Sequence, residues 1–191
     1  MIIAVDAAAR DTTEAEHVLH ELLAPVHAPV VACTHLVSGD GPPHYAVSVT
    51  GTAVGLEQHV RAWAAGRGAG VAITRAGASS PDLAGPSTLV RGAYVAAVEA
   101  ALGSAGRLVR WPGHEHAYGV LTAADLRARC GIDQIEALGG LPVEDDSRID
   151  TLGFLRPIRR VTGTVLQVQP AAGGLLIPFE LEHQQKCCAD H

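Results

Sequence analysis

The order of apolar patterns over residues 1–75 constrains the fold more than any other feature of the chain. Apolar or alternating runs typical of strands occur at 2–6, 30–37, 44–50 and 70–74. Between them, 12–23 and 54–65 repeat apolar residues at helical spacing. Prolines and glycines interrupt the chain between these segments. The sequence therefore predicts strand, helix, two strands, helix and strand, in that order.

That order is the one of a ferredoxin-like βαββαβ unit, which we expect at residues 1–76 of an α+β protein. Residues 77–106 are predicted to form a loop and a packing helix at 87–102. The buried stripe of that helix is expected to contain Val90, Tyr94, Ala97, Val98 and Ala101. A ferredoxin-like unit hosts many unrelated activities, so it indicates no function by itself.

Residues 107–191 are predicted to hold short helices, a β-meander and a His/Cys-rich tail. Thr122 and Asp133 each suit the first position of a short helix. The meander is expected from three apolar runs, at 153–158, 164–169 and 175–179.

Composition limits the classes of function. Of the 191 residues, 48% are hydrophobic and 18% charged, which suits a chain with an ordinary core. The net charge of −6 and the lack of a basic stripe argue against a nucleic-acid partner. We also expect no membrane partner, because no apolar run reaches 18 residues. The start of the chain does not resemble a secretion signal, so we expect a cytoplasmic protein with reduced cysteines.

The last nine residues carry the densest chemistry. In a helical tail, His183, Cys187 and His191 would share one stripe, with Cys188 beside it. Thiolate and imidazole ligands at this spacing favour zinc, with iron or copper as alternatives. The competing interpretations are a redox-active or reactive thiol pair and a frayed chain end without a role.

A second candidate is the segment His114-Glu115-His116. If it is extended, the two imidazoles project to the same side and could complete the metal site of the tail. Glu115 would then act as the catalytic base. An exposed loop in a histidine-rich chain is the alternative.

A third candidate precedes and opens the helix predicted at 87–102. Ser79, Ser80 and Ser87, together with Arg91, could bind an acidic group of a substrate at the positive end of that helix. Simple helix capping explains the same serines. His35 and His44 flank the turn between two predicted strands and could line a pocket, although hydrogen-bonded strand histidines are common.

These patterns favour a small metalloenzyme that acts on a polar or anionic small molecule. A non-catalytic metal-binding or metal-transfer protein is the first alternative. A helix-turn-helix regulator, built from the two short helices after residue 121, is the second. A homo-oligomer remains open.

Overall fold

The computed structural model describes residues 1–39 and 41–182. The protein is a mixed α+β molecule whose described part contains four α-helices and a large mixed sheet. It divides into two compact units. The first contains residues 1–112 and 158–162, and the second contains 113–157 and the chain from 163 onward. In the described residues, no helix is both long enough and apolar enough to cross a membrane.

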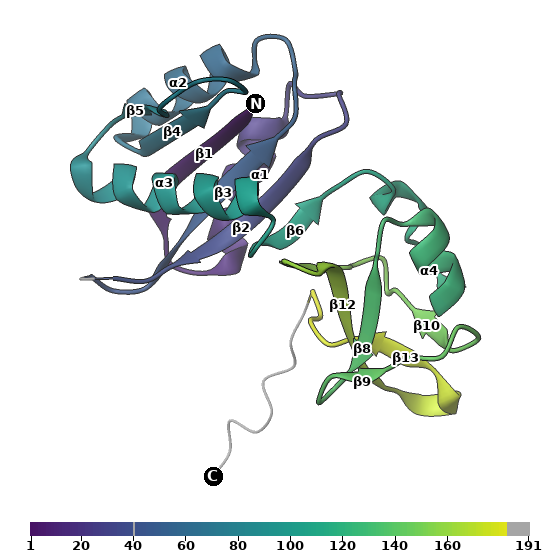
Figure 1. Ribbon diagram of the computed structural model, residues 1–191. Helices are drawn as coiled ribbons and strands as arrows, with labels where there is room; N and C mark the ends of the chain where they lie inside the picture. Colours follow the sequence, from purple (N-terminus) through teal and green to yellow (C-terminus); the bar gives the residue numbers. More distant parts are fainter. Residues whose placement is uncertain (40, 183–191) are drawn as a thin grey trace. The chain divides into compact units, whose positions relative to one another are not determined.

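The first unit is a seven-stranded antiparallel arrangement with three helices (Figure 1). Its strands follow the spatial order β5-β4-β1-β3-β2-β6-β11. In chain order the elements are β1 (Ile2–Ala9), α1 (Thr12–Leu23), β2 (Val31–Val37), β3 (His44–Thr50), α2 (Leu56–Arg67), β4 (Gly70–Thr74), β5 (Asp82–Ala84), α3 (Ser87–Leu102), β6 (Arg107–Arg110) and β11 (Ile158–Arg160).

Local chemistry sets the helix ends. Asp11 caps α1, because its carboxylate accepts a hydrogen bond of 2.8 Å from the Glu14 amide. Gly68 ends α2 in the left-handed region, at φ +64°, where its amide bonds carbonyls of the last turn.

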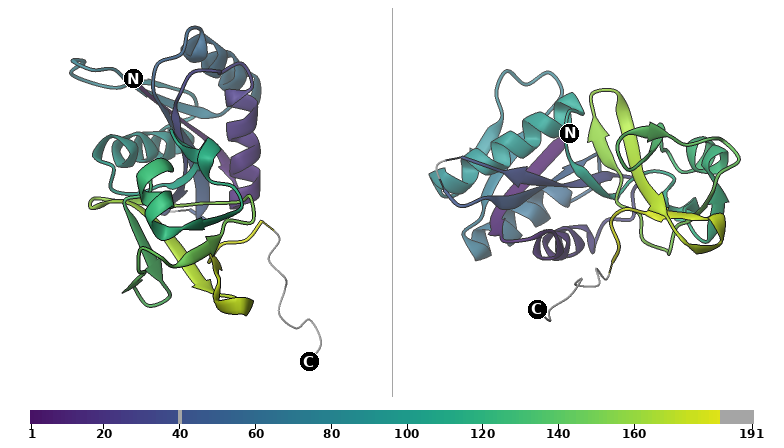
Figure 2. Two further views of the ribbon diagram at one scale, coloured as in Figure 1. Left: turned by 90° about the vertical axis from the view of Figure 1, so that its right-hand side faces the viewer. Right: turned by 90° about the horizontal axis from the view of Figure 1, so that it is seen from below.

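The two faces of the first sheet carry different helices. The views of Figure 2 show α1 and α3 on opposite sides of it. The face toward α1 and α2 is large and aliphatic. The face toward α3 is made of small residues: Ala4, Ala46 and Ala72 from the strands, and Ala93, Ala96 and Ala97 from α3.

The predicted buried stripe of α3 was wrong for most of its members. The buried residues are Gly92, Ala93, Ala96, Ala97 and Ala100, whereas Tyr94 and Val98 are exposed. Only Ala97 belongs to both sets. The reason is a close approach of α3 to the sheet: a Cβ on Gly70 of β4 would overlap the backbone at Leu89. Bulky side chains do not fit at that separation, so the helix turns its smallest residues inward.

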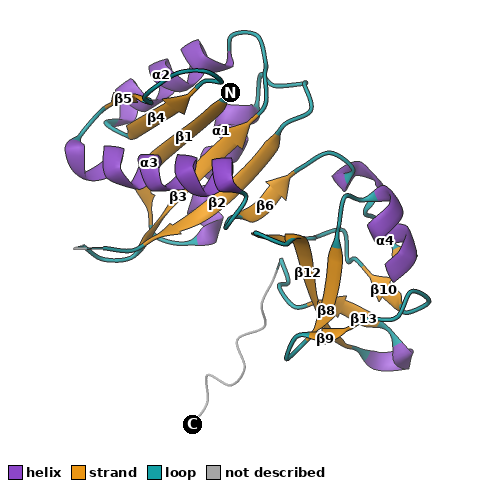
Figure 3. Cartoon of the chain, in the orientation of Figure 1, coloured by secondary structure: helices purple, strands orange, loops and turns teal. Residues whose placement is uncertain are grey.

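The second unit is built on mixed strand pairs (Figure 3). Strand β12 pairs in parallel with β8 and antiparallel with β13, while β13 pairs in parallel with β10. The unit is therefore larger than the simple meander that was expected. Its elements are η1 (His114–His116), β7 (Val120–Thr122), α4 (Ala123–Arg129), β8 (Gln134–Ala137), β9 (Leu141–Pro142), β10 (Arg148–Asp150), β12 (Gly163–Pro170), η2 (Ala172–Gly174) and β13 (Leu176–Pro178).

One predicted helix of this unit was confirmed and the other was wrong. Thr122 caps α4, accepting a 3.1 Å hydrogen bond from the Asp125 amide. Asp133 instead precedes strand β8, and its carboxylate accepts a 2.6 Å hydrogen bond from the Thr164 amide at the start of β12. Because the side chain binds another strand, it does not cap a helix. The helix-turn-helix alternative thereby loses its second helix.

Candidate functional site

The residues predicted for the metal site do not form one in the described part of the chain. The tail residues His183, Cys187, Cys188 and His191 lie outside the described residues. Across residues 1–39 and 41–182, no three His, Cys, Asp or Glu side chains gather into a group that could hold a metal ion.

His114, Glu115 and His116 form a single 3-10 turn, not the extended segment that was expected. Side chains two apart in such a turn do not share one side, so the two imidazoles are not arranged as a clasp. Each imidazole approaches the carboxylate between them: His114 Nδ1 is 3.4 Å and His116 Nε2 is 3.9 Å from oxygens of Glu115. All three side chains are at least one-third exposed.

The predicted anion-binding residues lie along one exposed stretch. Ser79 and Ser80 belong to the loop before β5, and Ser87 and Arg91 belong to the first two turns of α3. Pro86 occupies the position before α3 and supplies no side-chain cap. The guanidinium of Arg91 packs near Gly39.

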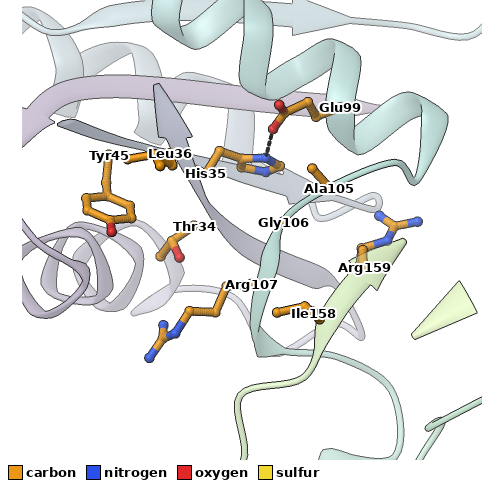
Figure 4. Close-up of a pocket in the computed structure, with 10 residues that line it drawn as sticks. All are labelled: Thr34, His35, Leu36, Tyr45, Glu99, Ala105, Gly106, Arg107, Ile158 and Arg159. Carbon is orange, nitrogen blue, oxygen red and sulfur yellow. Dashed lines mark hydrogen bonds and ion pairs between the residues drawn. The ribbon is translucent and has the colours of Figure 1, made fainter. Parts of the chain in front are cut away.

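The described residues contain a pocket of about 340 Å³ in the first unit, at the point where β2 extends beyond β6. Figure 4 shows its lining side chains. Charged and polar members are His35, Glu99, Arg107 and Arg159, with Thr34 and Tyr45. Leu36, Ala105, Gly106 and Ile158 complete the wall.

A line of hydrogen bonds runs from the helix–sheet interface into this pocket. His35 Nδ1 lies 2.8 Å from Glu99 Oε2, and His35 Nε2 lies 2.8 Å from Ser48 Oγ. A carboxylate can only accept, so the Nδ1–H donates to Glu99. The His35 side chain is completely buried, while that of Glu99 is 28% exposed. The Ser48 end of the line is therefore buried, and the Glu99 carboxylate at the other end is accessible from the pocket.

The alternation of β2 and β3 places these groups under α3. His35 shares its face of β2 with Cys33 and Val37, and Ser48 shares its face of β3 with Ala46. The carboxylate of Glu99 reaches this face from α3. Small neighbours leave room for an imidazole ring between helix and sheet.

Gly106 closes the wall behind His35. Its φ of +120° is reserved for glycine, and a Cβ there would lie 3.0 Å from the His35 ring and 3.3 Å from Cys33 Sγ. Burial raises the pKa of the Cys33 thiol to about 12, although Arg159 and Ser48 act in the opposite direction. At neutral pH, Cys33 is thus an inert thiol beside the line.

On the opposite face of β2, Thr34 also borders the pocket. It is only 2% exposed, and its hydroxyl has no hydrogen-bond partner among the described residues. An unsatisfied buried hydroxyl costs about 1–3 kcal/mol. Nearby, Arg107 forms a 2.6 Å ion pair with Glu16, and both side chains are largely buried.

A second acid–imidazole pair lies under the other end of α3. The buried carboxylate of Asp6 accepts hydrogen bonds from His44 Nε2 at 2.9 Å and from the Ala8 amide at 2.8 Å. Ala8 has a φ of +55° at an irregularity in the pairing of β1 with β3. Both ring nitrogens of His44 donate hydrogen bonds, Nε2 to Asp6 and Nδ1 to the Pro42 carbonyl, and these bonds hold the pair in place.

Sequence reasoning found part of the pocket. It singled out His35 as a side chain that could line a pocket, but it missed Ser48 and Glu99. The available signal was the alternation of β3, where small or polar residues alternate with Tyr45, Val47 and Val49. In a sheet covered on one face only, the small or polar residues of β3 would be exposed to solvent. Here α3 covers them.

In comparisons with protein-family models, curated proteins and solved structures, nothing matches the chain.

Proposed function

We propose that the first unit binds a polar small molecule in this pocket and that Glu99 accepts a proton or a hydrogen bond from it. The observation that carries the proposal is the hydrogen-bond line from Ser48 through His35 to a partly exposed carboxylate. A side chain held in this way is ready for general base or acid work without reorganisation.

The contacts of Glu99, His35 and Ser48 assign a different role to each side chain. The imidazole N–H of His35 occupies Glu99 Oε2, which fixes the orientation of the carboxylate and leaves Oε1 for a ligand. Ser48 fixes the ring of His35 from its other nitrogen. His35 is therefore a positioning residue, and Glu99 is the group that would touch the substrate.

The proposal is tested by titrating a panel of small amines, hydroxy acids, amino acids and sugars into isotope-labelled protein. Binders are expected to shift the amide resonances of Leu36, Ala105 and Gly106, which line the pocket. Glu99→Gln keeps an acceptor for the His35 N–H but loses the charge. It is expected to weaken binding at least about tenfold.

The matched control is Glu144→Gln, which changes an exposed carboxylate of the second unit. It should leave all affinities unchanged. The assignment of this pocket would be refuted if compounds bind the wild type but shift only amide resonances outside it, leaving those of Leu36, Ala105 and Gly106 unchanged.

We also propose, as a second function, metal binding by the tail residues together with His114 and His116. What supports it is the sequence spacing of His183, Cys187 and His191, with Cys188 beside them. Zinc is the expected ion, with iron or copper as alternatives. Elemental analysis of untagged protein should find about one ion per chain, and less in a Cys187→Ser, Cys188→Ser variant. Metal-free protein would refute it.

The ferredoxin-like assignment of residues 1–76 is likewise a proposal, supported by the antiparallel strand order β4-β1-β3-β2 and by α1 and α2 packing into one core. A cytoplasmic location is proposed from the cysteines, since Cys33 and Cys130 are buried free thiols.

A further inference from the structure

Two opposite charges line the pocket, and they approach it from different segments. Glu99 lies on the last turns of α3, and Arg159 lies on β11. In Figure 4 the Arg159 side chain is on the far side of the Ala105–Gly106 segment from His35. Both residues nevertheless line the same cavity.

The two charges have different neighbours: His35 for Glu99, and the Ala100 carbonyl and the Cys33 thiol for Arg159. Glu99 is paired with His35, and Arg159 Nη1 donates to the Ala100 carbonyl at 3.4 Å. Within the described residues, these two side chains form no ion pair with each other. The Ala100 contact uses one N–H of a guanidinium that has five.

The rest of the wall is suited to a short apolar group. Leu36, Ala105 and Ile158 are aliphatic, and about 340 Å³ is near the lower limit for small-molecule pockets.

We propose that the ligand is a small zwitterion, an apolar α-amino acid, whose ammonium group binds Glu99 and whose carboxylate binds Arg159. A molecule with both charges pairs with both side chains, whereas a singly charged molecule leaves one of them unpaired. This inference rests on the proposed function and adds the class of ligand.

The test compares L-valine with two molecules that each lack one of its charges. Isovalerate lacks the ammonium group, and isobutylamine lacks the carboxylate. Titrations are followed through the amide resonances of Gly106 and Leu36. Valine is expected to bind at least about tenfold more tightly than either of the others.

Variants separate the two contacts. Glu99→Gln should reduce the affinity for valine and isobutylamine and spare isovalerate. Arg159→Met should reduce the affinity for valine and isovalerate and spare isobutylamine. Arg159→Lys keeps the positive charge, so it should retain part of the affinity for valine and isovalerate. Arg148→Met, an exposed change in the second unit, serves as the control. Amide spectra of each variant report whether it is folded.

The outcomes distinguish this inference from the proposed function. If isovalerate or isobutylamine binds as tightly as valine, the zwitterion is wrong, but the pocket and Glu99 stand. The same holds if valine fails to bind while other compounds of the panel shift the pocket amides. If no compound moves these amides, both the zwitterion and the proposed function are overturned.

Discussion

At the scale of single residues, polar side chains between α3 and the sheet leave no spare volume. Gly92 of α3 shows this most directly, because a Cβ there would overlap Asp6 Oδ2. Gly92→Ala must displace a buried carboxylate that holds both His44 and the Ala8 amide. We expect a loss of about 3 kcal/mol in the free energy of unfolding, measured by urea denaturation.

Gly66→Ala is the matched control for that substitution. Gly66 lies in helix α2, and a Cβ there meets nothing within 4 Å. The helix should gain about 0.5–1 kcal/mol from the lower flexibility of alanine. Equal effects of the two substitutions would contradict the close approach of α3 to Asp6.

His44 predicts a pH dependence of stability. Partial burial disfavours its charged form, but hydrogen bonds to Asp6 and the Pro42 carbonyl outweigh this and raise the pKa of His44 above its ordinary 6.5. The protonated ring therefore stabilises the folded state fully below pH 6.5, and this contribution is lost as the pH rises through the raised pKa.

His44→Gln measures that contribution. The variant should be less stable than the wild type by about 1 kcal/mol at low pH, and the difference should shrink as the pH rises. Urea denaturation of both proteins across this range gives the result. A difference that grows with pH would show that the neutral ring is the stabilising form.

Cys33 is expected to resist alkylation. Its pKa of about 12 and its burial leave almost no accessible thiolate in the folded protein. At about pH 8, iodoacetamide should modify it at least about 100-fold more slowly in native protein than in concentrated guanidinium chloride. Peptide mass spectrometry gives the two rates. Rapid native modification would place the thiol at a surface.

At the scale of elements, the sequence predicted much of the first unit and less of the second. The strands at 44–50 and 70–74 and the helix at 87–102 have the predicted bounds, because glycines, prolines and clear periodicity mark their ends. The inward face of α3 could not be read in this way. Its largest apolar residues face outward because the sheet beneath it approaches too closely, and that separation is a property of the packed pair.

Two alanines of α3 test this account of the helix face. Ala96 is completely buried against the sheet, while Ala101 is exposed. Ala96→Leu should destabilise the protein by about 1–3 kcal/mol through overpacking. Ala101→Leu should change stability by less than about 0.5 kcal/mol. Thermal or urea denaturation of both variants measures the two changes in stability. Similar losses of stability would mean that the helix presents a different face to the sheet.

At the scale of the whole molecule, the pocket could not be predicted, because its lining comes from segments far apart in the chain. Residues 34–36, 45, 99, 105–107 and 158–159 meet there. The last two belong to a short return of the chain to the first unit after residue 157. Local motif reasoning instead selected clusters that are contiguous in the sequence, such as His114-Glu115-His116.

In the proposed function, Glu99 is the carboxylate that contacts a ligand in this pocket. The most direct measurement is carbon-13 NMR of protein labelled at glutamate side-chain carboxyls, recorded while the tightest-binding compound of the panel is added. The Glu99 resonance should move in proportion to the bound fraction, while that of the exposed Glu144 stays fixed. A Glu99 resonance that does not respond to a saturating ligand would contradict the claim.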